Sequence, residues 1–412
     1  MVVHELLSEK GKRISFPKDG ILSQSKEAKG RKINATIGMA AEDDGDIVCL
    51  DCIKKNILLD SKDVFPYVSS FGKLGLRDRW LELMKEKNPG LKDVSLPVVT
   101  GGLTHGLSIL GYLFVDEGDE IILGNKFWGN YRLIFEKGFK AKLNAFNLFK
   151  DGGFDLESFE EELNKDGVKK IILFNFPNNP SGYTVTEEEL KSIVEIVRRA
   201  VLNGKKILAI FDDAYFGLVY KEGVCRESLF SCFSDLHENV FCVKVDGATK
   251  EDYVWGFRVG FLTYGGKCVG REVFEMLEDK TAGVIRGSVS NVSHVGQSLI
   301  LDAINSLEYK KEKEEKFNLL KGRFEEVVRV LKDEKYLEFF KALPFNSGYF
   351  MCVELRDGLD AEKVRKDLLD RDVGVIVTGG LLRIAFSSVS KENISRLFDE
   401  IYEVCRFNFS RE

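Results

Sequence analysis

The chain is poor in the residues on which metal sites and disulfide scaffolds depend. Only four of its 412 residues are histidine, and they are scattered, so a histidine-centred metal site or catalytic triad has little support. Eight cysteines are too few for a disulfide scaffold in a chain of this length. The one close pair, Cys49 and Cys52, has no second pair of Cys or His ligands at matching spacing. We therefore expect buried thiols and no bound metal.

Long apolar runs and an excess of basic charge are also missing. No apolar run approaches the ~20 residues that a membrane span requires. The first residues, MVVHELLSEKGKRISF, lack the uninterrupted apolar segment of a signal peptide. Sixty basic residues are balanced by 66 acidic ones, and no basic stripe suggests a nucleic-acid partner. These absences predict a cytoplasmic protein that binds neither membrane nor nucleic acid.

Strand-like and helix-like segments alternate from about residue 95 to residue 265. The strand-like runs are LPVVTG, EIILGN, VKKIILFNF, KKILAIFDD, VFCVKVDG and RVGFLTYG. Between the third and fourth run, TEEELKSIVEIVRRAVLNG has apolar residues at helical spacing and begins with a capping box of Thr186 and Glu189. Such alternation predicts an α/β fold, with a mostly parallel sheet covered by helices on both faces, in three layers.

The chain is too long for one hydrophobic core, because single cores rarely exceed about 250 to 300 residues. After about residue 292 the pattern becomes helical, and the charge run within YKKEKEEKFNLLKGRFEEVVRVLKD is most simply a solvated helix face. The segments GYFMCVEL, GVIVTG and LLRIAFSS, with a helix around DAEKVRKDLLDRD, indicate a small α+β unit. We predict a large domain of residues 46–305 and a smaller domain formed by residues 1–45 and 306–412.

Polar residues gather where the predicted strands end. The run IFDDAY places Asp212 and Tyr215 directly after a buried strand, and FNFPNNPSG places Asn179 after the preceding one. Ligands of open α/β sheets bind at the carboxyl ends of the parallel strands, so these side chains should meet. The turn GGLTHGL, between a strand and a helix, can offer backbone N–H groups to a phosphate, although a plain tight turn is the alternative.

A lysine and an arginine follow a later strand, in KVDGATKEDYVWGFRVGF. A lysine with a lowered pKa, here Lys250, can form a Schiff base with an aldehyde. A buried carboxylate can keep a ring nitrogen protonated, and an arginine such as Arg258 can hold a phosphate. These are the requirements of pyridoxal 5'-phosphate (PLP), the cofactor that accepts electrons from the Cα of an amino acid.

The motifs occur in order from about residue 38 to residue 383, and with them the sequence resembles the class I/II aminotransferases, which are PLP-dependent enzymes of fold type I. Its pattern is closest to the aspartate aminotransferase-like branch. The resemblance rests on the segments YVSSFGKLGLRDRW, GGLTHGL, NKFWGNY, NNPSG, DDAYFG, TKEDYVWGFRVG and LLRIAFSS. It implies the PLP-dependent transferase fold and a homodimer whose active sites are shared across the interface.

The resemblance also implies roles for individual residues. It assigns the Schiff base and proton transfer to Lys250, the pyridine nitrogen to Asp212 and ring stacking to Trp128. It places Asn179 and Tyr215 at the phenolate oxygen of the cofactor. The residues that it places at the phosphate are Gly102, Leu103, Thr104, Arg258 and the Tyr67 of a neighbouring subunit. Simpler alternatives are that Trp128 belongs to the core and that Tyr215 is a buried tyrosine with a structural hydrogen bond.

One segment departs from the family pattern. Members often carry Ser-x-Ser before the lysine, whereas Gly247, Ala248 and Thr249 precede Lys250 here. A serine contact with the phosphate is therefore in doubt at position 247, and Thr249 is a candidate donor in its place.

Three residues are implied in substrate binding. Arg383 resembles the arginine that holds the substrate α-carboxylate, with a surface ion pair as the alternative, and Gly38 matches a backbone contact to the same group. Arg286, in VIRGSVSN, resembles an arginine that reaches a distal carboxylate from the other subunit. A helix-surface arginine is an equal alternative, because the following VSHVG lacks the expected proline.

Together these features predict an aminotransferase that moves an amino group between an L-amino acid and a 2-oxo acid, with aspartate or glutamate favoured as one substrate. A PLP-dependent lyase that catalyses β-elimination would use the same residues and stays open as an alternative. A PLP-binding regulator would need an added DNA-binding domain or a lost lysine; no such domain is visible, and Lys250 is present.

Overall fold

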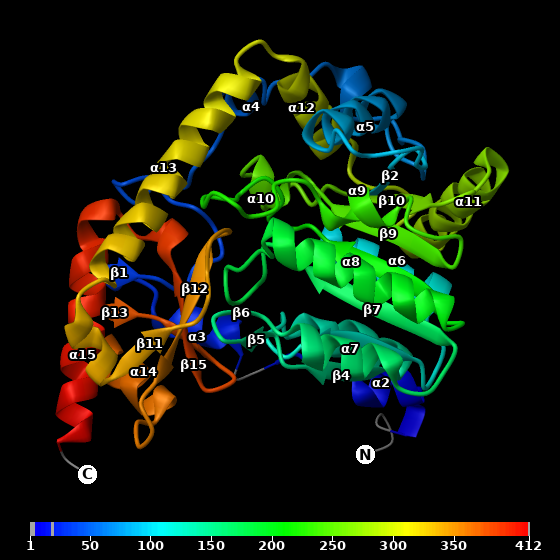
Figure 1. Cartoon of the computed structure of the whole chain (residues 1–412). Helices are drawn as coiled ribbons and strands as arrows, with labels where there is room; N and C mark the ends of the chain where they lie inside the picture. The colour runs from blue at the N-terminus through cyan, green and yellow to red at the C-terminus, as the bar shows by residue number, and fades with distance from the viewer. Residues whose placement is uncertain (1–4, 18–19, 411–412) are drawn as a thin grey trace.

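The computed structural model describes residues 5–17 and 20–410, which form a large sheet with helices on both faces and a smaller sheet beside it (Figure 1). The large sheet has seven strands in the order β2-β10-β9-β8-β7-β3-β4. Their bounds are Val98–Thr100 (β2), Glu120–Gly124 (β3), Lys142–Phe146 (β4), Lys169–Asn175 (β7), Lys206–Asp212 (β8), Val240–Asp246 (β9) and Gly260–Gly266 (β10).

Burial on both faces explains why these strands read as continuous apolar runs. After its first residue, β7 is buried throughout, and so is β8. The strands β4, β3, β7, β8 and β9 pair in parallel, whereas β10 is antiparallel to both β2 and β9. The predicted, mostly parallel sheet is confirmed, but β4 was not foreseen, because its burial is mixed and its sequence, KLNAF, has no clear period.

Helices complete the layers, with α7 and α8 in front of the sheet and α6 behind it in Figure 1. The predicted capping box of α8 is present, with the Thr186 side chain accepting from the Glu189 backbone N–H. The helices run Glu9–Arg13 (α2), Ile21–Glu27 (α3), Asp51–Lys54 (α4), Leu74–Lys87 (α5), Leu103–Phe114 (α6), Leu156–Asn164 (α7), Glu187–Leu202 (α8), Leu229–Phe233 (α9), Ala248–Glu251 (α10), Arg271–Ser288 (α11), His294–Asn305 (α12), Tyr309–Val330 (α13), Ala361–Leu369 (α14) and Ile394–Phe409 (α15).

The smaller sheet is antiparallel, in the order β11-β12-β15-β14, and packs with α14, which in turn packs with α15. Its strands are Phe340–Ala342 (β11), Phe350–Leu355 (β12), Ile376–Thr378 (β14) and Leu381–Ala385 (β15). A separate parallel pair joins β1 (Ile33–Asn34) to β13 (Val373–Gly374), which brings an early segment against the C-terminal part of the chain. The domain boundaries at residues 45/46 and 305/306 stay a prediction.

The charged helix α13 runs from the neighbourhood of α4 and α12 to the smaller sheet (Figure 1). The sequence predicted a solvated face for this helix, but some of its charged side chains are buried. The side chain of Arg323 is fully buried, where it donates to the Ser387 carbonyl and pairs with Asp43. Lys313, on the same helix, is also largely buried. Some of the charge run therefore has partners inside the molecule.

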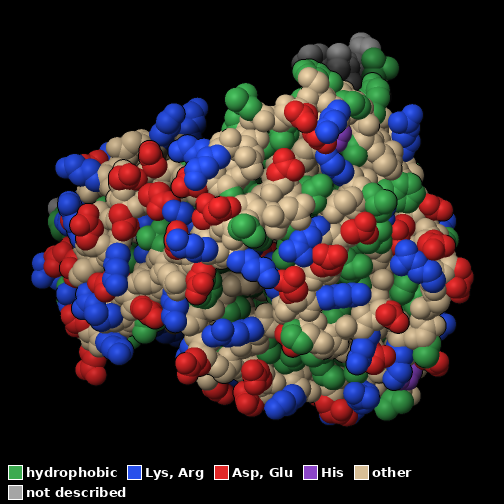
Figure 2. Space-filling view, turned by 90° about the horizontal axis from the view of Figure 1, so that it is seen from above, with side chains coloured by type: hydrophobic (Ala, Val, Ile, Leu, Met, Phe, Trp, Pro, Cys, Tyr) green, Lys and Arg blue, Asp and Glu red, His purple; other side chains and the backbone are tan. Residues whose placement is uncertain are grey.

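The surface carries both signs of charge, as the composition indicated. Figure 2 shows Lys and Arg side chains interspersed with Asp and Glu over one face. Within residues 5–17 and 20–410, no helix combines the length and apolar character needed to cross a membrane. All eight cysteines are free, including Cys49 and Cys52.

Candidate active site

The site lies at the carboxyl ends of β7 and β8. Asn175, the last residue of β7, stands opposite Asp212, the last residue of β8. The amide of Asn175 donates to the Asp212 carbonyl at 2.9 Å, and its oxygen accepts from the Asn179 backbone N–H at 2.9 Å. Asn175 thus connects the turn that carries Asn179 to the strand end that carries Asp212.

Asp212 is a buried carboxylate with two donors. The hydroxyl of Tyr131 donates to Oδ2 at 2.6 Å, and the backbone N–H of Ala214 donates to Oδ1 at 3.2 Å. Burial raises the pKa of Asp212 above its ordinary value, while the Tyr131 hydrogen bond and the charge of Lys250 act in the opposite direction. An acceptor held this way suits a protonated ring nitrogen.

Lys250 projects from the short helix α10 toward the same place. Its Nζ lies 5.1 Å from the centroid of the Tyr215 ring, and no described residue forms a hydrogen bond or ion pair with it. Burial lowers the pKa of Lys250 to about 8; the charge of Arg258 adds to this effect, and that of Asp212 opposes it. A much larger fraction of this amine than of an ordinary lysine amine is therefore unprotonated near neutral pH, and the unprotonated form is the nucleophile.

The turn before α6 brings Gly102 against Arg258. Gly102 has a φ of 81°, and a Cβ there would lie 2.4 Å from Nη2 of Arg258. Leu103 and Thr104 open the helix, with Leu103 buried and Thr104 exposed. Arg258 has no acidic partner among the described residues and donates only to the Trp255 carbonyl, at 3.0 Å. An uncompensated guanidinium beside a glycine turn and a helix N-terminus fits a phosphate.

Close packing explains why the family's serine is missing at position 247. A Cβ on Gly247 would lie 2.7 Å from the Cα of Gly260 and 2.7 Å from the Val259 carbonyl oxygen, so no side chain fits there. Two residues later, the hydroxyl of Thr249 is buried and has no hydrogen-bond partner in the described chain. A buried hydroxyl without a partner is unfavourable unless a ligand completes it, which is consistent with a phosphate donor at Thr249.

Arg383 lies on β15 and is buried, so the alternative of a surface ion pair is wrong. Its Nη2 donates to the Thr36 carbonyl at 3.2 Å, and its Nη1 lies 3.5 Å from Oδ1 of Asn179. The guanidinium sits over the Phe350 ring at 4.3 Å, and a Cβ on Gly38 would lie 3.7 Å from the same ring. Burial lowers the pKa of Arg383.

The Nε of Arg383 has no partner, and no described acid pairs with this arginine. A buried arginine without a counter-ion is a receptor for a carboxylate.

Each of the two predicted aromatic residues packs against a neighbour of Asp212 or of Arg383. Trp128 is half-buried and packs edge-on against Tyr131, with ring centroids 5.6 Å apart. Tyr215 is buried, with its ring edge-on to Tyr349 at 5.3 Å and to Phe350 at 5.7 Å. No described residue forms a hydrogen bond with the Tyr215 hydroxyl, so the structural hydrogen bond considered as an alternative is absent.

Tyr67 and Arg286 do not join the other site residues within this chain. Tyr67 is 90% exposed, and Arg286 is exposed and donates to the Ser290 hydroxyl at 3.0 Å. The two segments nevertheless adjoin, because the Ser70 hydroxyl donates to the Ser290 carbonyl at 2.8 Å. The segments that carry these two exposed residues therefore lie side by side.

Sequence reasoning missed Tyr131 and Asn175, which hold Asp212 in place. Tyr131 lies three residues after Trp128, so a one-turn spacing was the available signal. It also left Asp213 without a role. Asp213 pairs with the buried Lys244 and accepts from the Ser228 hydroxyl at 2.5 Å, on the side of the strand away from Asp212.

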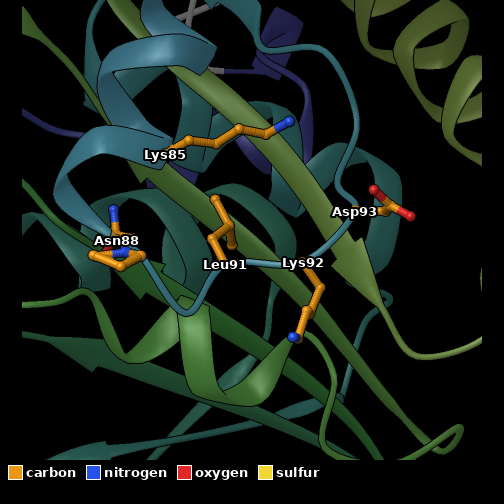
Figure 3. A pocket seen from close by; sticks show the side chains of 6 residues that line it. Lys85, Asn88, Leu91, Lys92 and Asp93 are labelled. Carbon is orange, nitrogen blue, oxygen red and sulfur yellow. The ribbon is translucent and has the colours of Figure 1, made fainter.

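Two pockets of the described surface contain none of the predicted site residues. The pocket of Figure 3 lies after α5 and is lined by Lys85, Asn88, Pro89, Leu91, Lys92 and Asp93. Within residues 5–17 and 20–410, no cluster of His, Cys, Asp and Glu could hold a metal ion. The site is therefore defined by the unpaired Lys250, Arg258 and Arg383 around the buried Asp212.

Known proteins match both the sequence and the fold. A probable aspartate/prephenate aminotransferase from Aquifex aeolicus is 28% identical over 390 residues, covering 91% of this chain and 92% of that protein. A crystal structure of an aminotransferase from Anaerococcus prevotii has a TM-score of 0.86 and 25% identity, covering 97% of this chain and 99% of that one.

An aspartate aminotransferase from Thermus thermophilus, solved with maleate, has a TM-score of 0.75 at 18% identity and covers 97% of this chain and 99% of that one. The sequence profile of aminotransferase class I and II matches residues 31–401. The chain belongs to the aminotransferase class I and II family.

Proposed function

We propose that this aminotransferase uses Lys250 as its Schiff-base lysine and acts on a dicarboxylic amino acid such as aspartate or glutamate. The observation that carries the first part is the half-buried Lys250 amine, which has a lowered pKa and no partner beside the buried Asp212. Transamination itself follows from membership of the family, whose cofactor is PLP. When bound, PLP supplies an aldehyde and an electron-accepting ring.

The residues of this chain would divide the work by their chemistry. Asp212 would accept a hydrogen bond from the protonated ring nitrogen, with Tyr131 keeping its carboxylate in place. Arg258 and the Gly102 turn would hold the phosphate dianion, and Arg383 would hold the α-carboxylate of the substrate. The amine of Lys250, close to these groups, would take the proton from the substrate Cα.

The preference for a dicarboxylic substrate rests on Arg286 and on a homodimer. Arg286 is exposed, with no acidic partner among the described residues, and so is free to pair with a carboxylate from outside its own subunit. Exposed apolar side chains lie close to both residues in the chain: Phe65, near Tyr67, is 82% exposed, and Val289, near Arg286, is 52% exposed. A surface of this kind suits a symmetric contact in which each subunit completes the site of the other. The Aquifex relative carries aspartate in its name, which supports the same substrate class.

One experiment tests the lysine and the substrate class together. Purified protein loaded with PLP is mixed separately with L-aspartate, L-glutamate, L-tyrosine and L-alanine, and its visible absorbance and the released oxo acid are measured. We expect the band of the lysine-bound cofactor to disappear with release of the matching 2-oxo acid, fastest for the dicarboxylic donors. The Lys250→Ala protein should show no such band.

Other outcomes would reject parts of the proposal. A normal band in the Lys250→Ala protein would exclude Lys250. A band that persists with every donor would exclude ordinary transamination, and release of pyruvate and ammonia from a cysteine-like donor would indicate a lyase. Equal rates for aspartate and alanine would remove the dicarboxylic preference.

A further inference from the structure

Two buried carboxylates follow Lys250 directly in the chain. Glu251 ends α10 and Asp252 caps it, and their side chains are only 8% and 1% exposed. A carboxylate near an amine stabilises the ammonium form, and an ammonium does not attack an aldehyde. If the side chain of Glu251 or of Asp252 turned toward the Lys250 amine, its charge would therefore favour the unreactive ammonium form.

Lysines from two other helices hold these carboxylates. Nζ of Lys313, on α13, lies 3.1 Å from Oε1 of Glu251 and 2.8 Å from Oδ1 of Asp252. Lys87, the last residue of α5, pairs with the same Oε1 of Glu251. Burial by itself would raise the pKa of Glu251, but the two lysines outweigh it and the pKa is lowered.

Asp252 depends on Lys313 more than Glu251 does. Its Oδ1 accepts a second hydrogen bond from the Tyr309 hydroxyl at 2.6 Å, while its Oδ2 is buried without a partner in the described chain. Lys313 is the one cation that pairs with Asp252 among the described residues. Removing it would leave a buried charge with a single neutral donor, which is strongly unfavourable.

The charges that shift the pKa of Lys250 belong to residues other than Glu251 and Asp252. They are Asp212 at the end of β8 and Arg258 after α10. The Lys250 backbone is tied separately, because its carbonyl accepts from the Tyr349 hydroxyl at 2.9 Å. Glu251 and Asp252 are not among the charges that shift the pKa of Lys250, although they follow it directly in the chain.

The remaining ionisable groups near the two carboxylates are paired or neutral. Lys244 forms ion pairs with Asp213 and Asp246, so that cluster is largely balanced within itself. Burial raises the pKa of Tyr253 and of Cys52, and both stay neutral at ordinary pH.

We propose that Lys313, assisted by Lys87, is a positioning residue for the Schiff-base lysine: it fixes Glu251 and Asp252 on the far side of α10 and so keeps their charges away from Lys250. The inference rests on the proposed role of Lys250. It connects α13, which also packs against α15, to the reactive amine through Glu251 and Asp252.

The test is a pH titration of the visible absorbance of the PLP-loaded protein, which reports the pKa of the Schiff-base nitrogen without turnover. In Lys313→Met, the released carboxylates should raise the midpoint by about one pH unit or more, the usual effect of a nearby opposite charge. Lys313→Arg keeps the charge and should keep the wild-type midpoint. Lys87→Met, which removes a half-exposed partner, should give a smaller rise.

Two comparisons separate positioning from simple loss of stability. In Lys313→Met/Asp252→Asn, the second change removes the released charge, so the midpoint should return toward the wild-type value. Lys310→Met on the same helix breaks only an exposed pair with Glu86 and should not move the midpoint.

Unchanged midpoints in Lys313→Met and in Lys87→Met would overturn the proposal, and Lys87→Met alone decides if Lys313→Met does not fold. A wild-type protein without a visible band would instead reject the role of Lys250 itself.

Discussion

At the scale of single residues, the properties of Asp212 and Lys250 come from neighbours rather than from the residues themselves. An aspartate at a strand end becomes a buried acceptor because Tyr131 and the Ala214 N–H hold it. The pKa of Lys250 falls because burial disfavours its ammonium form. Both effects can be measured one side chain at a time.

Tyr131→Phe should weaken the hold on the cofactor. Loss of the hydrogen bond to Asp212 removes an interaction with a charged group, worth about 1.5 to 3 kcal/mol, and lets the Asp212 pKa rise further. We expect the dissociation constant for PLP to increase at least about tenfold, measured by absorbance titration of the cofactor-free protein. Tyr112→Phe, at a 70% exposed position on α6, is the matched control. Equal affinities of the two variants would contradict the role of Tyr131.

The rate of PLP binding should depend on pH through Lys250. Because the folded-state pKa is lowered to about 8, the free amine predominates above that pH and declines below it. The rate at which the visible band forms after mixing PLP with cofactor-free protein should therefore rise with pH through a midpoint near 8. A midpoint near the ~10.4 of an ordinary lysine would show that burial does not act on this amine.

At the scale of elements, the backbone is shaped around the expected phosphate. The Gly102 turn, the Gly260 end of β10 and the Gly247 start of α10 approach so closely that a Cβ on any of them would meet backbone or the Arg258 guanidinium at 2.4–2.7 Å. Gly102 thus meets two glycines from a much later part of the chain, and the three form one small unit.

Gly102→Ala should therefore abolish tight cofactor binding. It places a Cβ at a φ of 81° and a ψ of 173°, a conformation essentially limited to glycine and strained by about 1 to 3 kcal/mol for other residues, and it displaces Arg258 as well. The matched control is Gly118→Ala, where φ is 89° but no atom lies within 4 Å of the new Cβ. Both variants should lose some thermal stability, whereas only Gly102→Ala should lose PLP affinity. If both kept full affinity, the Gly102 turn would not be the phosphate site.

At the scale of the whole molecule, the position of Tyr67 and Arg286 raises the question of a second subunit. Both are exposed and outside the site of their own chain. Sharing across a symmetric interface would give each a place beside the substrate or cofactor of the partner subunit.

Mixed dimers test this arrangement directly. Lys250→Ala and Arg286→Ala proteins should each be nearly inactive with aspartate. Unfolding and refolding them together forms dimers in which one site combines an intact Lys250 with an intact Arg286, so about a quarter of wild-type activity should return. No recovery, with mixed dimers shown to be present, would place Arg286 outside the neighbouring site.

Local patterns carried much of the prediction. The buried strands β7, β8 and β9, the capping box of α8 and the polar strand ends were expected because periodicity and caps act over a few residues. The contacts at Tyr131 and Lys313 were not, because their partners lie far away in the chain. The antiparallel direction of β10 likewise depends on which strands it meets.

The sequence by itself determined the class of chemistry, because a lysine, an aspartate, an arginine and a glycine turn at successive strand ends have few other uses. Only the tertiary structure decided whether those groups were available. It left Arg383 buried without a counter-ion, turned Arg286 outward and paired Glu251 and Asp252 with Lys313. The physical reason is that burial and charge pairing are set by residues from separate helices and strands, which only folding brings together.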